Sequence, residues 1–221
     1  MTQTALRPAL PAPRPHGDPA ALGDLRFSRL LPAADWAALP AAVRARFSKR
    51  YAPGRSATYA GVVSECRLSK AGWLLAQAAR LIGAPLPLDR GGGMAAVVTV
   101  TEHAPSGGQV WTRVYARPGG FPQVIHSAKQ FAGATGLEEY LGYGVGMALR
   151  IAARPDRLEF HSNHYFLRLG RRRLLLPRWL EPGALRIAHI DHGGGCFAFV
   201  LDLRHQLLGE LIHQHAEFHD A

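Results

Sequence analysis

Residues 141–151 read LGYGVGMALRI, and this stretch decides the predicted fold. Its odd-numbered positions are bulky, whereas its even-numbered positions are glycine or alanine up to Ala148. Such alternation is the period of a β-strand, in which successive side chains point to opposite faces. A helix would instead hold three glycines within about one and a half turns, each costing about 1 kcal/mol relative to alanine. We therefore predict a strand with one bare face, and we expect a helix, a ligand or a tight bend of the sheet to lie against Gly142, Gly144 and Gly146.

Short apolar runs separated by glycine and proline turns follow one another from residue 94 to residue 218. About nine strands joined by such short turns require an antiparallel meander. A meander of this length curls or closes so as to hide its edges. We therefore predict an α+β fold that is mostly β, with a curved sheet or barrel-like half-shell and one main helix packed on it.

That helix is predicted at residues 70–82, and shorter helices are predicted before residue 50. Ser69 is a typical N-cap residue, and Gly83 ends the helical pattern. The apolar face of the helix includes Trp73, so we expect this face to be buried on the sheet. Residues 1–23 are rich in proline and alanine, which predicts a disordered tail before a single globular domain over residues 24–221.

The charge of the chain is strongly basic, with a formal net charge of +10 and a pI of about 10.4. This charge favours anionic partners such as nucleic acid, acidic lipid head groups or a phosphorylated ligand. The densest cluster is Arg171, Arg172 and Arg173. It predicts weak, non-specific anion binding, or else a basic hairpin tip that simply stays in water.

Several features favour a location in the reducing cytoplasm. No run is long enough to span a bilayer, and the N-terminus lacks the apolar core of a secretion signal. The two cysteines, Cys66 and Cys196, form no CxxC pair, so neither a redox motif nor a cysteine zinc site is supported. Whether the two thiols lie close together does not follow from the sequence.

A candidate binding face lies on the strand predicted at residues 110–117. Trp111, Arg113 and Tyr115 alternate along it and therefore share one side. An aromatic ring beside a guanidinium suits a pocket that holds an anionic group. The simpler interpretation is a core tryptophan with an arginine at its rim.

Other chemistry finds less support in the sequence. His213 and His215 share one strand face, but the opposite face carries the apolar residues, so both histidines are expected in water and no metal site is predicted. No motif marks a catalytic nucleophile or base, and catalytic residues stay unassigned. The glycines at residues 142–146 lie inside a predicted strand rather than between a strand and a helix, so they form no dinucleotide fingerprint and no cofactor is expected.

The order of several short motifs resembles a known bacterial family. These motifs are LPAAVR at residues 39–44, LIGAP at 81–85, WTRVY at 111–115, LRL at 167–169, FAF at 197–199, LLG at 207–209 and the closing Phe218. In that order they are similar to the domain of unknown function 4166, over about residues 30–218. The resemblance implies a cytoplasmic accessory domain, since such domains also occur joined behind nucleotide-binding oxidoreductase-like domains. It brings no catalytic residues, and the histidine-rich last third departs from the family pattern.

Three functions fit these observations. The first is a non-catalytic ligand-binding or accessory domain, whose sheet and helix enclose a partly apolar cavity for a small apolar or anionic ligand. The second is a small enzyme that uses arginine and histidine in that cavity. The third is a binder of anionic surfaces that acts through Arg171, Arg172 and Arg173. The sequence identifies neither the ligand nor the oligomeric state.

Overall fold

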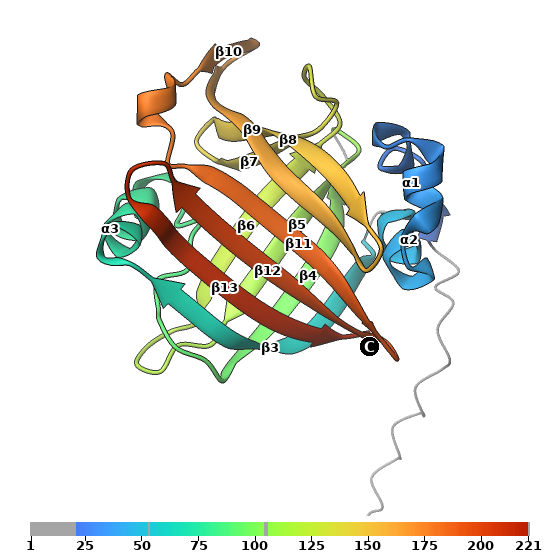
Figure 1. Ribbon diagram of the computed structural model, residues 1–221, viewed down its shortest axis with the longest axis horizontal. Helices are drawn as coiled ribbons and strands as arrows, with labels where there is room; N and C mark the ends of the chain where they lie inside the picture. The colour runs from blue at the N-terminus through green and yellow to red at the C-terminus, as the bar shows by residue number, and fades with distance from the viewer. Residues whose placement is uncertain (1–20, 53, 104–105, 221) are drawn as a thin grey trace, which may run out of the picture.

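The computed structural model describes residues 21–52, 54–103 and 106–220, which are dominated by one barrel (Figure 1). Ten antiparallel strands form this barrel. In chain order they are β3 (Ser56–Leu68), β4 (Met94–His103), β5 (Gly108–Tyr115), β6 (Gln123–Gln130), β7 (Glu138–Gly142), β8 (Val145–Arg154), β9 (Arg157–Leu169), β11 (Ala184–Gly193), β12 (Cys196–His205) and β13 (Gly209–His219). The predicted antiparallel, mostly-β fold is confirmed.

The ring closes because β9 pairs along both of its edges. On one edge β8 pairs with β9 from Arg157 to Leu167, and on the other edge β11 pairs with the first residues of β9, up to His161. The end of β9 pairs instead with β10 (Arg172–Leu175), a short strand that leaves the barrel wall. On the far side of the ring β13 pairs with β3, so the described barrel strands close on themselves rather than stopping at a half-shell.

Short helices sit at the two ends of the barrel (Figure 1). One end, called the α2 end, carries η1 (Ser28–Leu30), α1 (Ala33–Ala38) and α2 (Ala41–Phe47). The buried Phe47 of α2 packs against the barrel interior, with its ring centroid 6.3 Å from that of Trp111 and 5.6 Å from that of Phe160. These aromatic contacts plug the α2 end. None of the helices in the described ranges is long and apolar enough to cross a membrane.

The described chain begins slightly before the predicted domain boundary. Residues 21–23 form β1 (Ala21–Gly23), which pairs with β2 (Lys49–Tyr51). The sequence predicts a disordered tail up to residue 23, and β1 is formed by the last three residues of that stretch. The remainder of that predicted tail, residues 1–20, lies outside the described residues.

The opposite end of the barrel, called the α3 end, carries α3 (Lys70–Ala78) and η2 (Ala79–Ile82). As predicted, Ser69 caps the helix, with its hydroxyl oxygen accepting from the amide of Gly72 at 3.0 Å. The predicted burial of the Trp73 face was wrong. Trp73 is 42% exposed and Leu81 is 84% exposed, because the helix packs on the barrel through small residues, Gly72, Ala76 and Ala79.

The stretch at residues 141–151 is not one continuous strand. β7 ends at Gly142 and β8 begins at Val145, with Tyr143 and Gly144 forming a tight turn. Both turn residues have positive φ, 49° and 82°, as in the two-residue turns whose twist matches a β-hairpin. The glycine of this turn is thus required by backbone geometry, and the alternation of bulky and small residues spans a hairpin.

The close approach of α3 to β13 gives a stability test at Gly72. Intrinsic helix propensity favours alanine over glycine by about 1 kcal/mol. An added Cβ would, however, lie 1.9 Å from the carbonyl oxygen of Leu211. We expect Gly72→Ala to lower the free energy of unfolding by about 1–3 kcal/mol in chemical denaturation. The control Gly119→Ala, with nothing within 4 Å of its Cβ, should change it little; a stabilised Gly72→Ala would contradict the packing.

Candidate ligand-binding site

The barrel encloses a cavity of about 440 Å³. This volume falls in the range of about 300–1,000 Å³ that is typical of small-molecule sites. Its walls are inward-facing aromatic and aliphatic side chains from strands all around the ring, including Val98, Trp111, Met147, Phe160, Phe199 and Leu201. At the α3 end it is roofed by Leu75, Ile82, Leu86 and Leu180, the last from η3 (Arg178–Leu180). The cavity is therefore apolar over most of its surface.

One wall of the cavity carries a buried cluster of charges. Lys129 of β6 and Glu139 of β7 are paired in register, with 3.1 Å between Nζ and Oε1. Both side chains are almost fully buried, at 4% and 2% exposure. Ser127 donates its hydroxyl to the same Oε1 at 2.5 Å, and Arg113 of β5 donates Nη2 to the Ser127 hydroxyl at 3.2 Å. Three polar side chains, from the adjacent strands β5 and β6, thus converge on the Glu139 carboxylate.

The charges of the cluster do not cancel. Burial alone would raise the pKa of Glu139, but the nearby charges of Lys129 and Arg113 outweigh it and hold this pKa below its usual range. Burial lowers the pKa of Lys129, an effect that the contact with Glu139 opposes. Lys129 also lies over two aromatic rings, 4.9 Å from the centroid of Trp111 and 5.3 Å from that of Phe160. With the carboxylate and both cations ionised, Arg113 leaves a net positive charge at the cavity wall.

The cluster also leaves hydrogen-bonding capacity unused. Oε2 of Glu139 is buried and has no hydrogen-bond partner among the described residues. The Arg113 side chain is 19% exposed and lines the cavity. Buried polar atoms are rarely left unpaired, so this wall suits either ordered water or the polar group of a ligand.

The structure brings some of the predicted site residues together. Trp111, Arg113 and Tyr115 all line the cavity, as their shared strand face predicted. The three glycines do not line it. A Cβ on Gly142 would lie 2.4 Å from the carbonyl oxygen of Ile82, and one on Gly146 would lie 2.7 Å from the Phe166 ring. Gly144 belongs to the hairpin turn, where a Cβ would meet the carbonyl oxygen of Arg168.

The predicted arginine cluster is divided between two environments. Arg171 and Arg172 are exposed where β9 turns into β10. Arg173 instead reaches the buried Glu138, with 2.8 Å between its Nε and Oε1 of the carboxylate. The third arginine therefore has a structural partner and is not free to bind an anion.

Sequence reasoning missed Lys129, Glu139 and Ser127. The signal was present, because Ser127 and Lys129 alternate with Ile125 and so share its inward face. What the sequence did not contain was the register of β6 against β7. That register places Lys129 opposite Glu139, ten residues later in the chain.

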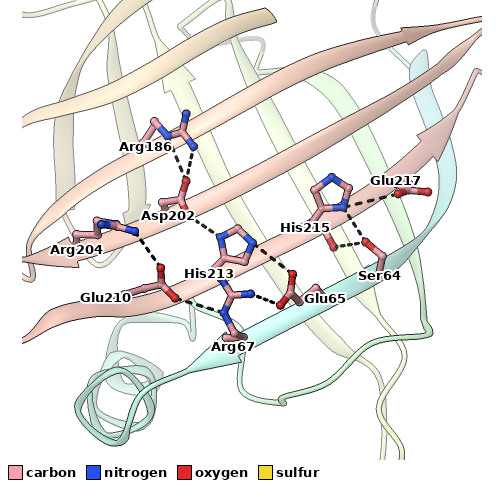
Figure 2. A network of polar contacts seen from close by, with 10 residues as sticks. All are labelled: Ser64, Glu65, Arg67, Arg186, Asp202, Arg204, Glu210, His213, His215 and Glu217. Atoms are coloured by element: carbon pink, nitrogen blue, oxygen red, sulfur yellow. Dashed lines mark hydrogen bonds and ion pairs between the residues drawn. The ribbon is translucent and has the colours of Figure 1, made fainter.

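A second polar network lies on the outer face of the barrel (Figure 2). Ligand atoms of Asp202, Glu210 and His213 lie within 4.8 Å of one another, the one such group found among the described residues. Arginine already engages both carboxylates, however. Nη2 of Arg186 lies 2.6 Å from Asp202, and Glu210 contacts Arg67 and Arg204. The geometry is that of an ion-pair network, since a cation here would have to displace these guanidinium groups.

His213 and His215 both point outward from β13, as the strand pattern predicted (Figure 2). His213 donates its Nδ1–H to Oδ1 of the Asp202 carboxylate at 2.7 Å. Nδ1 of His215 lies 2.7 Å from the hydroxyl oxygen of Ser64, within hydrogen-bond distance. Neither histidine takes part in the cavity.

A different histidine, His189, is buried at the α2 end, 1% exposed. Its ring stacks on Phe197 at 4.9 Å and meets Phe199 edge-on at 4.8 Å. Neither ring nitrogen has a hydrogen-bond partner among the described residues. Burial, together with the charge of Arg46 nearby, lowers the pKa of His189 to about 3.

This histidine predicts a loss of stability in acid. Below about pH 6.5 the unfolded chain takes up a proton on this ring, while the folded chain stays neutral down to about pH 3, so the free energy of unfolding falls over this range. We expect His189→Leu to lose less stability than the wild type between about pH 7 and pH 4 in urea denaturation. The control His126→Leu, at an exposed histidine, should keep the wild-type pH dependence. If the free energy of unfolding changes with pH in the same way in all three proteins, His189 is not the cause of the loss in acid.

Comparison with known proteins places the chain in a family without assigning it an activity. No curated protein and no solved structure matches it. The family model described as a domain of unknown function, DUF4166, matches residues 39–218. These residues run from the segment before α2 almost to the end of β13, and so include the whole barrel. The chain therefore belongs to the DUF4166 family.

Proposed function

We propose that the chain binds a small amphipathic molecule without chemically altering it, with the apolar body of the ligand in the barrel cavity and an acidic head group at Arg113. The observation that carries this proposal is an enclosed apolar cavity with one net-positive cluster in its wall. An accessory role beside an oxidoreductase-like domain, and a cytoplasmic location, are compatible with such a carrier.

The apolar body follows from the cavity lining. Trp111, Phe160 and Phe199, with the aliphatic residues around them, offer few hydrogen bonds to water. A water molecule in a cavity needs two to four polar partners, and most of this volume provides none. Replacing such poorly held water with hydrocarbon is favourable.

The acidic head group follows from the charge balance. Two cations face one carboxylate, so a bound carboxylate would make the cluster neutral. A guanidinium presents paired donors that match a carboxylate in geometry, and the low dielectric of the interior strengthens such a contact. Lys129 remains paired with Glu139, which leaves Arg113 as the partner of the ligand.

Binding is favoured over catalysis by the described side chains that line the cavity, where Lys129 is held in an ion pair with Glu139. Among the described residues, those lining the cavity include neither histidine nor cysteine. Glu139 is the carboxylate that lines it, and its lowered pKa makes it a weak base. An enzyme that uses arginine and histidine in this cavity is therefore the less supported alternative.

A cavity-filling substitution tests the location of the ligand. Val98 and Val97 are neighbours on β4, but Val98 lines the cavity and is 2% exposed, whereas Val97 faces outward and is 36% exposed. We expect Val98→Trp to weaken the binding of dodecanoate by about tenfold or more in isothermal titration, because the indole occupies ligand volume. Val97→Trp should bind as the wild type does. Equal affinity in both variants, each with a cooperative melting transition, would place the ligand outside the barrel.

Ligands that differ only in the head group test the role of Arg113. We expect the wild type to bind dodecanoate more tightly than dodecanol by about tenfold to a hundredfold, since a hydrogen bond to a charged group contributes about 1.5–3 kcal/mol. Arg113→Met should remove most of this preference, and Arg113→Lys should keep part of it. If Arg113→Met still prefers dodecanoate over dodecanol by the same factor as the wild type, the head group does not bind at Arg113. This outcome is independent of the Val98→Trp test, which concerns only the location of the apolar chain.

A further inference from the structure

The large hydrophobic side chains on the surface are not evenly spread. All but five of those that are exposed in the described residues come from the connections after β3, β5, β7, β9 and β12. The five exceptions are Leu25, Val62, Val97, Val124 and Leu169, the last residue of β9. In an antiparallel meander these connections meet at one end of the barrel, which here is the α3 end (Figure 1). Examples, with their exposure, are Leu81 at 84%, Phe121 at 92%, Tyr143 at 82%, Trp179 at 78% and Leu207 at 89%.

The same end carries exposed basic side chains without acidic partners. Arg80, Arg171, Arg172 and Arg178 are exposed, and none forms an ion pair with an acidic side chain among the described residues. Near the α2 end, Arg26, Arg46, Arg50 and Arg157 are each paired with an aspartate or glutamate, whereas Arg29 and Arg55 are exposed and form no ion pair with an acidic side chain among the described residues. Uncompensated positive charge and exposed apolar surface therefore coincide at the α3 end.

From this coincidence we propose that the α3 end docks on the surface of an anionic lipid bilayer. Soluble proteins rarely expose such concentrations of large apolar side chains unless the surface binds something. Tryptophan, tyrosine and leucine insert at the boundary between head groups and acyl chains, while arginine is attracted to acidic head groups. Nucleic acid would satisfy the arginines but would leave leucines such as Leu81 and Leu207 in water.

Docking in this orientation turns the roof of the cavity toward the lipid. Leu180 lines the cavity and is itself 53% exposed, beside Trp179 at 78%. Leu81 also lines the cavity although it is 84% exposed, beside the half-buried Ile82. The residues that would enter the bilayer are thus adjacent in sequence to those that cover the ligand site. The proposal concerns the outer surface and does not depend on what the cavity holds.

Sedimentation of the full chain with lipid vesicles tests the proposal. We expect the protein to bind vesicles that contain phosphatidylglycerol and to bind phosphatidylcholine vesicles about tenfold more weakly. Arg171→Ser/Arg172→Ser should weaken binding to the anionic vesicles by about tenfold. The matched control Arg29→Ser/Arg55→Ser removes two exposed arginines from near the α2 end and should bind as the wild type does.

The apolar contribution is tested with a second pair of variants. Trp179→Ser/Leu207→Ser alters only exposed side chains at the α3 end that do not line the cavity, and Leu25→Ser alters one that lies elsewhere and is 62% exposed. The first variant should lose the part of vesicle binding that persists at high salt, and the second should keep it. The proposal is overturned if the wild type does not bind vesicles, or if its binding vanishes at high salt. It is also overturned if each variant binds vesicles as its control does, or if single-stranded nucleic acid displaces the vesicles. Val98→Trp should bind vesicles normally, which separates this result from the ligand test.

Discussion

The pairing of β9 with a neighbour on each edge is the constraint on which the rest of the molecule depends. A strand this long could not follow β8 throughout and still turn to meet β11 unless it changed register along the way. The shift occurs where Ala148 pairs with His164 and Leu149 with Ser162, which leaves Asn163 as an extra residue in β9. Because the ring closes, its strands have no edges to protect, and their inner faces surround one volume.

The enclosed volume is only partly filled by the protein, and the buried charges help to explain why. Charged residues at core positions are costly unless they are paired. Lys129, Glu139 and Ser127 meet this requirement for one another, while Arg113 reaches them from the next strand. An aliphatic core at these positions would be simpler and more stable, so the cluster favours a role in recognition over a role in stability.

The sequence predicted the wall of this barrel better than its ends. Alternation along single strands was enough to place Trp111, Arg113 and Tyr115 on one inner face, and to place His213 on the outer one. Local patterns do not contain strand register, so the meeting of Lys129 with Glu139 could not be predicted. An apolar helix face in the sequence likewise does not show which element, if any, packs against it. Gly72 and Ala76 allowed α3 to approach β13 through its small residues, which left Trp73 and Leu81 outside.

The two ends of the barrel are therefore covered by side chains of different size. The α2 end is held by interlocking aromatic rings around Phe47 and His189, and each ring would expose a large apolar area if it moved. The fully buried residues of α3 and η2 are glycine and alanine, and the larger Leu75 and Ile82, which cover the cavity, are only partly buried. Segments with little buried apolar area open at the lowest cost in free energy. For the ligand proposed above, we therefore expect entry at the α3 end, where large apolar side chains already face outward.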